Sequence, residues 1–356
     1  MRPSAIDTSR RPFVIVWELT QACDLACKHC RADAQPNRHP NELSTAEGKR
    51  LLEQIAEFGE DQLVVFSGGD PMARSDTIEL VRYGLDQGLE LTITPSGTQS
   101  LTADHIAELA ESGIRRMALS IDGATPDAHD EFRGEAGSFA ETMRAAEHVR
   151  AVDIPLQINT TVCQETVDEL PGICDLVNDL DAVLWSVFFL VPVGRGAVLT
   201  PISPKRAESV MHWLHQTQSS AGIPIKTTEA PFYRRVSLQQ EMEAGEGSRL
   251  GRGIIAGDGF AFVSHIGELY PSGFLPQSAG NVRDEHVAEL YRESPLFAKI
   301  RDRDQLVGKC GSCPYRHICG GSRSRAYAWT GNPLESDPLC PFIPTGYDGP
   351  LPLTIE

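Results

Sequence analysis

The chain has 356 residues, which is enough for one large domain or two ordinary ones, and we expect two. Acidic residues outnumber basic residues by 49 to 32, the formal net charge is -17, and no long tract of lysine and arginine occurs. The charge disfavours nucleic acid as a partner, and the longest apolar stretch, Val183 to Val193, contains Ser186 and Pro192, so we expect no membrane span.

The first expected element is a strand at Phe13–Trp17, and a loop with three cysteines, Cys23, Cys27 and Cys30, follows it. Three thiolates on one short loop form an incomplete metal site, which leaves a coordination position for a reacting group. Soft thiolates favour iron–sulfur clusters or zinc. Structural zinc sites usually begin with Cys-x2-Cys pairs, whereas this loop reads Cys-x3-Cys-x2-Cys.

This spacing after a first strand resembles the radical S-adenosylmethionine superfamily. The resemblance implies that Cys23, Cys27 and Cys30 hold a [4Fe-4S] cluster, whose fourth iron is chelated by the amino and carboxylate groups of S-adenosylmethionine. It also implies that one electron from the cluster cleaves the sulfonium to a 5′-deoxyadenosyl radical. A reduced structural thiol group or a zinc knuckle is the alternative.

Helices and apolar strands alternate after this loop. A capping box at Ser44–Glu47 begins the first helix, and Gly59 stands where it should stop. Further strands are expected at 63–66, 89–94, 116–121, 156–162 and 183–190, with helices at 78–88 and 102–112 and others beginning at 138, 166 and 203. This alternation predicts a parallel sheet with right-handed crossovers, either open or closed. The family resemblance implies an α/β fold, a partial (β/α)6 TIM-like barrel over residues 13–222.

Polar residues follow several strands, at the edge where parallel α/β folds bind ligands. Gly68, Gly69 and Asp70 resemble the family's Gly-Gly-Glu motif, with Asp70 in place of glutamate, and this implies backbone contact with the amino group of S-adenosylmethionine. Arg195 stands between two glycines after the last strand, either placed to meet a carboxylate or in a solvated turn. Further candidates for contacts to the ribose and the carboxylate, each with a capping or turn role as the alternative, are Thr94, Ser96, Ser120, Asp122, Asn159 and Thr161.

In the sequence the alternation stops near residue 223, and we expect a second domain over residues 223–356. It contains a β-hairpin around Ile266–Gly267. Its four cysteines, Cys310, Cys313, Cys319 and Cys340, are a complete ligand set for zinc or for a cluster. Behind a radical S-adenosylmethionine core they resemble the SPASM/twitch extension, which implies one auxiliary [4Fe-4S] cluster on these residues. A full SPASM domain binds a second one, but Ser272 and Arg323 stand in two of its cysteine positions, so we expect that cluster to be absent.

Nine cysteines at metal-ligand spacings, without a secretory signal, argue against disulfides and for a reducing, cytoplasmic compartment. Seven of them belong to the two groups described above. Cys174 shares a helical face with Leu170, Ile173 and Val177, so we expect it to be buried. Cys163 lies near a strand end, and its role stays open.

The resemblance implies an enzyme, a radical S-adenosylmethionine oxidoreductase or maturase that abstracts hydrogen from a bulky substrate. Two substrates compete: a tetrapyrrole side chain, as in haem and haem d1 formation, and a ribosomal peptide held by a separate recognition protein. The carboxylates of a tetrapyrrole fit Arg195, Arg323 and Arg325, and we favour that substrate. The alternative role of Arg323 and Arg325, which stand beside the predicted auxiliary cluster, is to balance its negative charge and raise its potential. Ferredoxin or flavodoxin would supply electrons, and Tyr327 and Asp122 are candidates for a general acid or base. A non-enzymatic iron–sulfur or zinc protein is the alternative class, which the three-ligand site disfavours.

Overall fold

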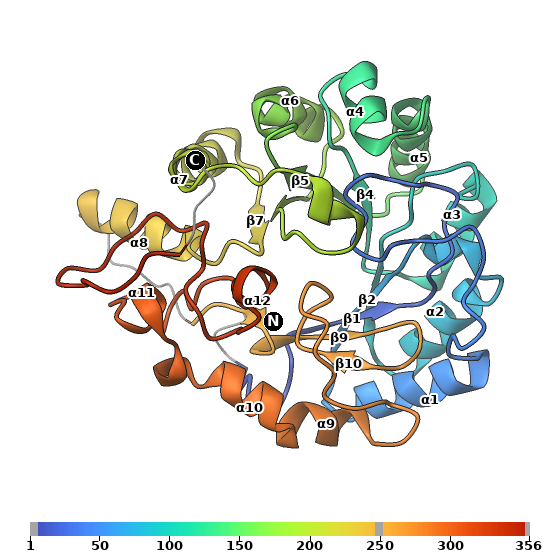
Figure 1. The fold of residues 1–356 in the computed structure, drawn as a ribbon. Helices are drawn as coiled ribbons and strands as arrows, with labels where there is room; N and C mark the ends of the chain where they lie inside the picture. Colours follow the sequence, from blue (N-terminus) through green and yellow to red (C-terminus); the bar gives the residue numbers. More distant parts are fainter. Residues whose placement is uncertain (1–5, 246–251, 353–356) are drawn as a thin grey trace.

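The structure, a computed structural model, describes residues 6–245 and 252–352. Its centre is one sheet in which the strands follow the order β10-β9-β1-β2-β3-β4-β5-β6-β7, with β8 paired to β9. The sheet curves into a partial barrel with helices around its outside (Figure 1). The strands are β1 Val14–Glu18, β2 Leu63–Ser67, β3 Glu90–Ile93, β4 Arg116–Ser120, β5 Leu156–Val162, β6 Leu184–Phe189, β7 Ile225–Thr228, β8 Ile255–Ala256, β9 Gly259–Val263 and β10 Leu269–Tyr270.

Helices connect most successive strands, and several more follow the last strand. The α-helices are α1 Thr45–Ala56, α2 Thr77–Asp86, α3 Ala103–Ser112, α4 Pro126–Arg133, α5 Ser138–Ala151, α6 Leu170–Asp179, α7 Pro204–Ala221, α8 Tyr233–Glu243, α9 Val287–Glu293, α10 Pro295–Arg301, α11 Gly308–Gly311 and α12 Arg323–Thr330. The short 3-10 helices are η2 Pro71–Ala73, η3 Val167–Glu169, η4 Gly194–Val198 and η5 Arg303–Gln305. No helix in the described part of the chain is long and apolar enough to cross a membrane.

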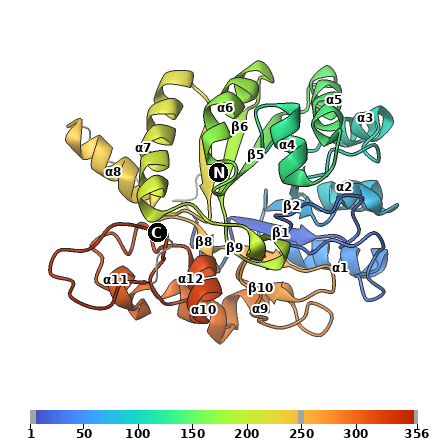
Figure 2. The same ribbon diagram turned by 45° about the horizontal axis from the view of Figure 1, so that its top comes forward.

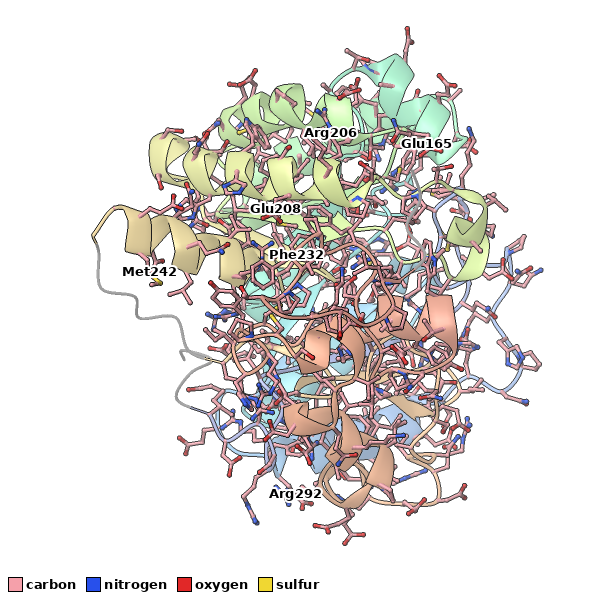
Figure 3. All side chains as sticks on the ribbon, turned by 60° about the vertical axis from the view of Figure 1, so that its left-hand side comes forward. Glu165, Arg206, Glu208, Phe232, Met242 and Arg292 are labelled. Carbon is pink, nitrogen blue, oxygen red and sulfur yellow. The ribbon has the colours of Figure 1, made fainter. Side chains whose placement is uncertain are left out.

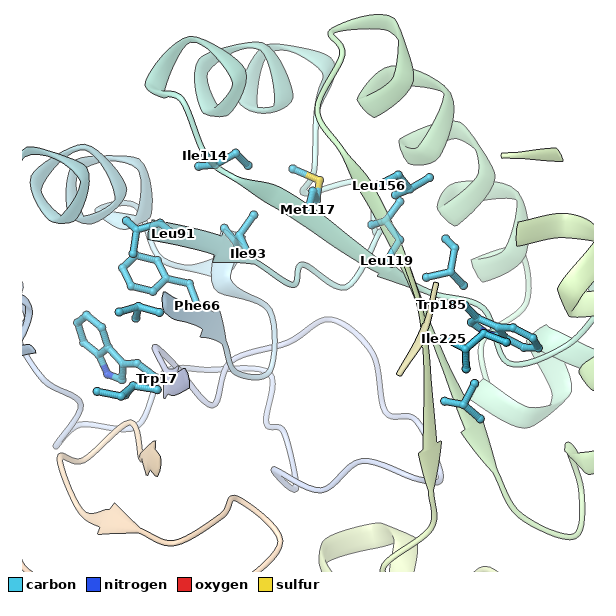
Figure 4. Close-up of a cluster of buried hydrophobic side chains, with 14 of the residues drawn as sticks. Trp17, Phe66, Leu91, Ile93, Ile114, Met117, Leu119, Leu156, Trp185 and Ile225 are labelled. Carbon is cyan, nitrogen blue, oxygen red and sulfur yellow. The ribbon is translucent and has the colours of Figure 1, made fainter. Parts of the chain in front are cut away.

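The predicted strands and most predicted helices are confirmed within a residue or two. Strands β1 to β6 are parallel, as the sequence predicted from the helices between them, and β7 pairs in parallel with β6. The outward faces of these strands form the core with the helices, and Trp17, Phe66, Met117 and Trp185 are fully buried there (Figure 4). The capping box also forms, because the Ser44 hydroxyl accepts the Glu47 N–H while the Glu47 carboxylate accepts the Ser44 N–H.

Helix α4 and strand β7 of the barrel were missed, and the sequence did not predict strand β8 or helices α8 to α12 either. Helix α4 lies between β4 and the helix expected at residue 138, and its signals are a Thr125 cap, a proline in the first turn and Gly134 at φ 73°. Strand β7 continues the sheet beside β6, so the expectation that alternation stops near residue 223 is wrong. Its four residues, Ile-Lys-Thr-Thr, contain no apolar run, and pairing with β6 alone makes them a strand.

The carboxyl-terminal third joins the same sheet. The expected hairpin is confirmed, because β10 pairs with β9 in antiparallel register. Strand β9 also pairs with β1 in parallel, Val14 opposite Phe260, which attaches the hairpin to the first strand of the barrel. Helix α12 lies beside β8 at this end of the sheet (Figure 2). The boundary between two domains therefore remains a prediction, since hydrogen bonds of one sheet run through both proposed parts.

Candidate active site

The loop that follows β1 brings the first three cysteines together. Cys23 and Cys27 are buried and Cys30 is half-buried, and all three belong to one small apolar cluster with Leu25 and Ala34. The base of the loop is closed where the N–H of Cys23 donates to the carbonyl of Gln35, at 2.8 Å. Three thiols on one short loop are the donor set that a cuboidal cluster with one open iron requires.

Backbone N–H groups already point at two of these sulfur atoms. The Leu25 N–H donates to the Cys23 sulfur and the Ala34 N–H to the Cys30 sulfur, each at 3.4 Å. Burial raises the pKa of Cys23 to about 11, so the thiol stays protonated until a metal centre displaces its proton. The residues present fit an iron–sulfur cluster in donor chemistry and in hydrogen bonding to sulfur.

The glycine pair after β2 packs against the start of the cysteine loop. The N–H groups of Gly69 and Asp70 donate to the carbonyls of Thr20 and Ala22, at 2.8 and 2.7 Å. A Cβ on Gly68 would lie 2.5 Å from the Thr20 carbonyl oxygen, and one on Gly69 would collide with that of Ala22. The two glycines thus permit the backbone to approach the cysteine loop itself. The sequence did not reveal this reason for having glycine at both positions.

Asp70 and Ser96 lie beside Cys23. The Ser96 hydroxyl donates to the Gly69 carbonyl at 3.1 Å and lies 3.2 Å from the Cys23 sulfur. The buried Asp70 carboxylate accepts hydrogen bonds from the Met72 N–H and the Ser100 hydroxyl, and burial, which these bonds only partly offset, raises its pKa. Gly68, Gly69, Asp70 and Ser96 are therefore brought together with the cysteine loop.

Ser120 and Asn159 are direct neighbours in the register of β4 and β5. The Asn159 side-chain oxygen accepts a hydrogen bond from the Gln157 amide at 2.6 Å. Both positions lie between strand residues that pack outward into the core, so they face the barrel interior.

Asp122 is engaged within the protein. Its carboxylate accepts the Thr161 N–H at 2.7 Å and two N–H groups of Arg133 at 3.1 and 3.2 Å. Burial would raise its pKa, but His29 and Arg133 outweigh burial and lower it. A carboxylate held ionised by these partners does not supply the general acid considered from the sequence.

Sequence reasoning missed His29 and the surroundings of Arg133. The His29 ring stacks on Phe132 of α4, with the ring centres 4.7 Å apart, and its Nε2 lies 3.7 Å from the Asp122 carboxylate. Burial lowers the pKa of His29 to about 4, so the imidazole is neutral at pH 7. Its place between Cys27 and Cys30, together with the helix signals of α4, was the clue available in the sequence.

Arg195 fastens the cysteine loop and is not a solvated turn residue. Its guanidinium donates to the carbonyls of Cys27 and Ala34, at 3.0 and 2.8 Å, and its backbone N–H donates to the carbonyl of Cys30. One buried nitrogen, Nη2, has no hydrogen-bond partner among the described residues. The side chain therefore positions the loop and keeps one N–H group available to a ligand.

The second cysteine group surrounds a pocket at the carboxyl-terminal end of the chain. Cys310, Cys313, Cys319 and Cys340 all line it, together with Arg235, Lys309 and Phe342. The Gly321 N–H donates to the Cys319 sulfur at 3.3 Å, and the Asp337 N–H donates to the Cys310 sulfur at 3.4 Å. Arg235 is held there by an ion pair with Glu208 of α7, on the side shown in Figure 3. Four thiols around one pocket fit a closed cluster site.

Comparison with known proteins shows which proteins this chain resembles. The family model described as the radical SAM superfamily matches residues 17–177. An AdoMet-dependent heme synthase of Methanosarcina barkeri is 39% identical over 347 residues, covering 95% of this chain and 99% of the relative. A second protein of that name, from Oleidesulfovibrio alaskensis, is 38% identical and covers 93% of this chain and 87% of its own length.

The chain belongs to the radical SAM superfamily. It is a radical SAM enzyme, of a family that uses a [4Fe-4S] cluster and S-adenosylmethionine. The crystal structure of Streptococcus suis SuiB bound to precursor peptide SuiA shares the fold at a TM-score of 0.74 and 18% identity, covering 94% of this chain and 76% of that one. The partial barrel predicted from the sequence is confirmed.

Two positions of a second auxiliary cluster carry other side chains in this radical SAM enzyme. The Ser272 hydroxyl donates to the Glu229 carboxylate at 3.1 Å, and the hydroxyls of Ser322 and Ser324 donate to the same carboxylate, at 2.5 and 2.8 Å. Arg323 is fully buried, with its N–H groups directed at backbone carbonyls and at the Cys310 sulfur.

The prediction that Arg323 and Arg325 bind substrate carboxylates is wrong. Arg325 is buried, pairs with Asp337 at 3.1 Å, and donates to the carbonyls of Phe189, Leu190 and Glu229. Its five donors thus join the end of β6 to the carboxyl-terminal segment. Tyr327 packs beside the small apolar cluster of Ala256, Leu275 and Ile300. Cys174 is buried, as expected, and Cys163 is buried with its N–H donating to the Thr166 hydroxyl.

Proposed function

We propose that the chain cleaves S-adenosylmethionine at a [4Fe-4S] cluster on Cys23, Cys27 and Cys30 and abstracts hydrogen from a tetrapyrrole side chain during haem formation. The observation that carries the substrate assignment is similarity along the whole chain to two proteins named heme synthase, at 39% and 38% identity. The peptide-bound neighbour shares only 18% identity, so it supports the fold and leaves the substrate to the closer sequences.

The residues divide the work as follows. When bound, the cluster supplies one electron that splits the sulfonium into methionine and a 5′-deoxyadenosyl radical, and that radical takes a hydrogen atom from the substrate. Gly69, Asp70 and Ser96 lie next to Cys23 and are placed to hold the methionine end of the nucleotide. Ser120, Asn159 and the free N–H of Arg195 offer further polar contacts at the barrel interior.

The second cysteine group would hold one auxiliary [4Fe-4S] cluster. Its four thiols leave no open iron, so electron transfer or structural support suits it better than direct binding of substrate. A small reduced electron carrier, ferredoxin or flavodoxin, would supply the catalytic electron, and free thiols at both sites suit the cytoplasm.

The test is substrate-dependent formation of 5′-deoxyadenosine. Anaerobically reconstituted protein is incubated with dithionite, S-adenosylmethionine and either tetrapyrroles carrying several carboxylates or precursor peptides. We expect a rise with one tetrapyrrole, together with conversion of that compound, and none with the Cys27→Ser variant. Stimulation by a peptide alone would favour the alternative peptide maturase, and no 5′-deoxyadenosine under any condition would remove the radical chemistry from this protein.

A further inference from the structure

Arg31 lies between the cysteine loop and the carboxyl-terminal hairpin. It directly follows Cys30, and the Cα atoms of adjacent residues are about 3.8 Å apart. Its Nη2 donates to the Glu18 carboxylate at 2.5 Å, and its guanidinium carbon lies 4.6 Å from the centre of the Phe262 ring. Glu18 ends β1 and Phe262 belongs to β9, the strand that pairs with β1 on the side away from β2. A group bound by Arg31 would therefore be close to the proposed catalytic cluster.

The partners of this arginine face the interior of the barrel. Trp17 of β1 and Val263 of β9 pack outward into the core. Because side chains alternate along a strand, the adjacent residues Glu18 and Phe262 project to the inner face. Tyr270 of β10 is opposite Phe262 in the hairpin, and the two rings are stacked with their centres 6.3 Å apart. The hairpin thus contributes aromatic rings to the inner face, and the guanidinium lies over one of them.

Glu18 fixes the position of Arg31. The Glu18 side chain is buried, and its second oxygen lies 2.6 Å from Nδ1 of His265. Burial would raise the pKa of Glu18, but Arg31 and His265 outweigh burial and lower it, so the carboxylate is ionised at pH 7. An opposite charge therefore holds one nitrogen of the guanidinium.

Most donors of Arg31 remain available. An arginine carries five N–H groups. In the described part of the chain, Nε and Nη1 of Arg31 form no hydrogen bond, and neither of them is buried. Gly273, in the loop after β10, leaves room for the arginine on its ring, because a Cβ there would lie 3.1 Å from Nε of Arg31 and 2.8 Å from the Phe262 ring. The ion pair with Glu18 does not account for the remaining donors, which are free to bind an anion.

This arrangement suits a substrate carboxylate. A guanidinium that is held by a buried carboxylate, lies on an aromatic ring and keeps accessible donors is preorganised to bind a second carboxylate. The arginines that the sequence suggested for this role are engaged elsewhere: Arg323 and Arg325 with protein groups, and Arg195 mainly with the cysteine loop. The flat macrocycle of a tetrapyrrole can in addition pack against aromatic side chains such as Tyr270.

We propose that Arg31 binds a carboxylate of the tetrapyrrole inside the barrel, beside the cysteine loop, and that Glu18 and Phe262 position its guanidinium. This proposal rests on the function proposed above. Phe262 lies in β9 on one side of β1, whereas Gly69 and Ser96, which are placed to hold the nucleotide, follow β2 and β3 on its other side. The substrate would therefore reach the cluster from the side of the hairpin, and the nucleotide from the opposite side.

The test measures how the reconstituted protein binds coproporphyrin III, a tetrapyrrole whose side chains carry carboxylates, from the shift of the porphyrin absorption band. Arg31→Gln removes the charge, and Arg31→Lys keeps the charge but loses the planar fork. We expect the dissociation constant to rise about tenfold or more in Arg31→Gln and by less in Arg31→Lys. Arg38→Gln is the control and should bind as the wild type does, because Arg38 belongs to the same loop and also pairs with a glutamate, Glu42, but is 42% exposed.

A double variant separates a binding role from a structural one. Arg31→Gln alone leaves the buried Glu18 with one partner fewer, which costs stability, whereas Glu18→Gln combined with Arg31→Gln removes both charges. The double variant should keep its iron content and its affinity for S-adenosylmethionine and still bind the porphyrin about tenfold more weakly. Wild-type affinity for the porphyrin in this variant, or loss of iron and of S-adenosylmethionine binding in every Arg31 variant, would overturn this inference alone. If the wild type does not bind the porphyrin, this inference fails too, whereas the proposed function fails only if no tetrapyrrole stimulates formation of 5′-deoxyadenosine.

Discussion

Arg323 places a positive charge against the second cysteine group. It is fully buried, its Nη2 lies 3.8 Å from the Cys310 sulfur, and its Nη1 donates to the carbonyls of Pro333 and Glu335 at 2.8 Å. Hydrogen bonds and positive charge near cluster sulfurs stabilise the reduced, more negative form. Arg323 is therefore placed to act on a cluster bound by the second cysteine group.

We expect Arg323→Gln to lower the reduction potential of the auxiliary cluster, and Arg323→Lys, which keeps the charge, to lower it less. The measurement is a redox titration followed by electron paramagnetic resonance, with Cys23, Cys27 and Cys30 replaced by alanine so that one cluster is observed. Arg150→Gln is the control, because Arg150 of α5 is an exposed residue that pairs with Asp181 and does not line the pocket of the second cysteine group. Equal potentials in all of these proteins would contradict a tuning role.

Among single residues, the sequence allowed us to predict the site residues that belong to local sequence patterns. The cysteine triplet, the glycine pair and the four later cysteines are local patterns, and each group is close in space. Arg325 could not be interpreted in this way, because its partners Phe189, Glu229 and Asp337 come from three distant segments. Only the fold reveals that its donors are already used.

Among the elements, the cysteine loop and the turn after β2 depend on each other. The Gly68–Asp70 backbone donates to Thr20 and Ala22, so the loop takes its position from the second strand as well as the first. The strands that were predicted carry short apolar runs, or, in β5, apolar residues that alternate with polar ones. Helix α4 and strand β7 were missed because one is short and polar and the other has a lysine in its middle.

Gly69→Ala should displace the cysteine loop, because the new methyl group collides with the Ala22 carbonyl oxygen. We expect iron content to fall from about eight to about four atoms per chain, with the auxiliary cluster retained. Iron and sulfide analysis after anaerobic reconstitution measures this change. Gly113→Ala is the control, since it adds backbone strain at φ 84° in open space, far from either cysteine group. Full iron loading of Gly69→Ala would show that the loop tolerates the displacement.

For the whole molecule, Lys226 makes stability depend on pH. Folding lowers the pKa of Lys226 from 10.5 to about 8, through burial first and Arg116 second. Between those values the unfolded chain binds more protons than the folded chain, so stability rises as pH increases through this window. The loss of stability caused by the charged Lys226 in the folded state is fully present below about pH 8.

We expect the difference between the unfolding midpoints of the wild type and Lys226→Met to shift in favour of the wild type as the pH rises from 7 to 9.5. Differential scanning at both pH values measures the two midpoints. The control is Lys205→Met, which removes an exposed lysine of α7 and should leave the pH dependence of the wild type intact. Parallel pH profiles for the wild type and Lys226→Met would show that folding does not destabilise the charged form of Lys226.

The pairing of β9 with β1 has a consequence for biosynthesis. While the chain emerges from the ribosome, Val14–Glu18 can pair with β2 early, but its other edge stays open until Phe260 has been made. The nascent protein thus carries its first three cysteines on a half-supported scaffold for most of translation. Insertion of the catalytic iron would then follow release of the finished polypeptide, at a moment when both metal centres can be filled.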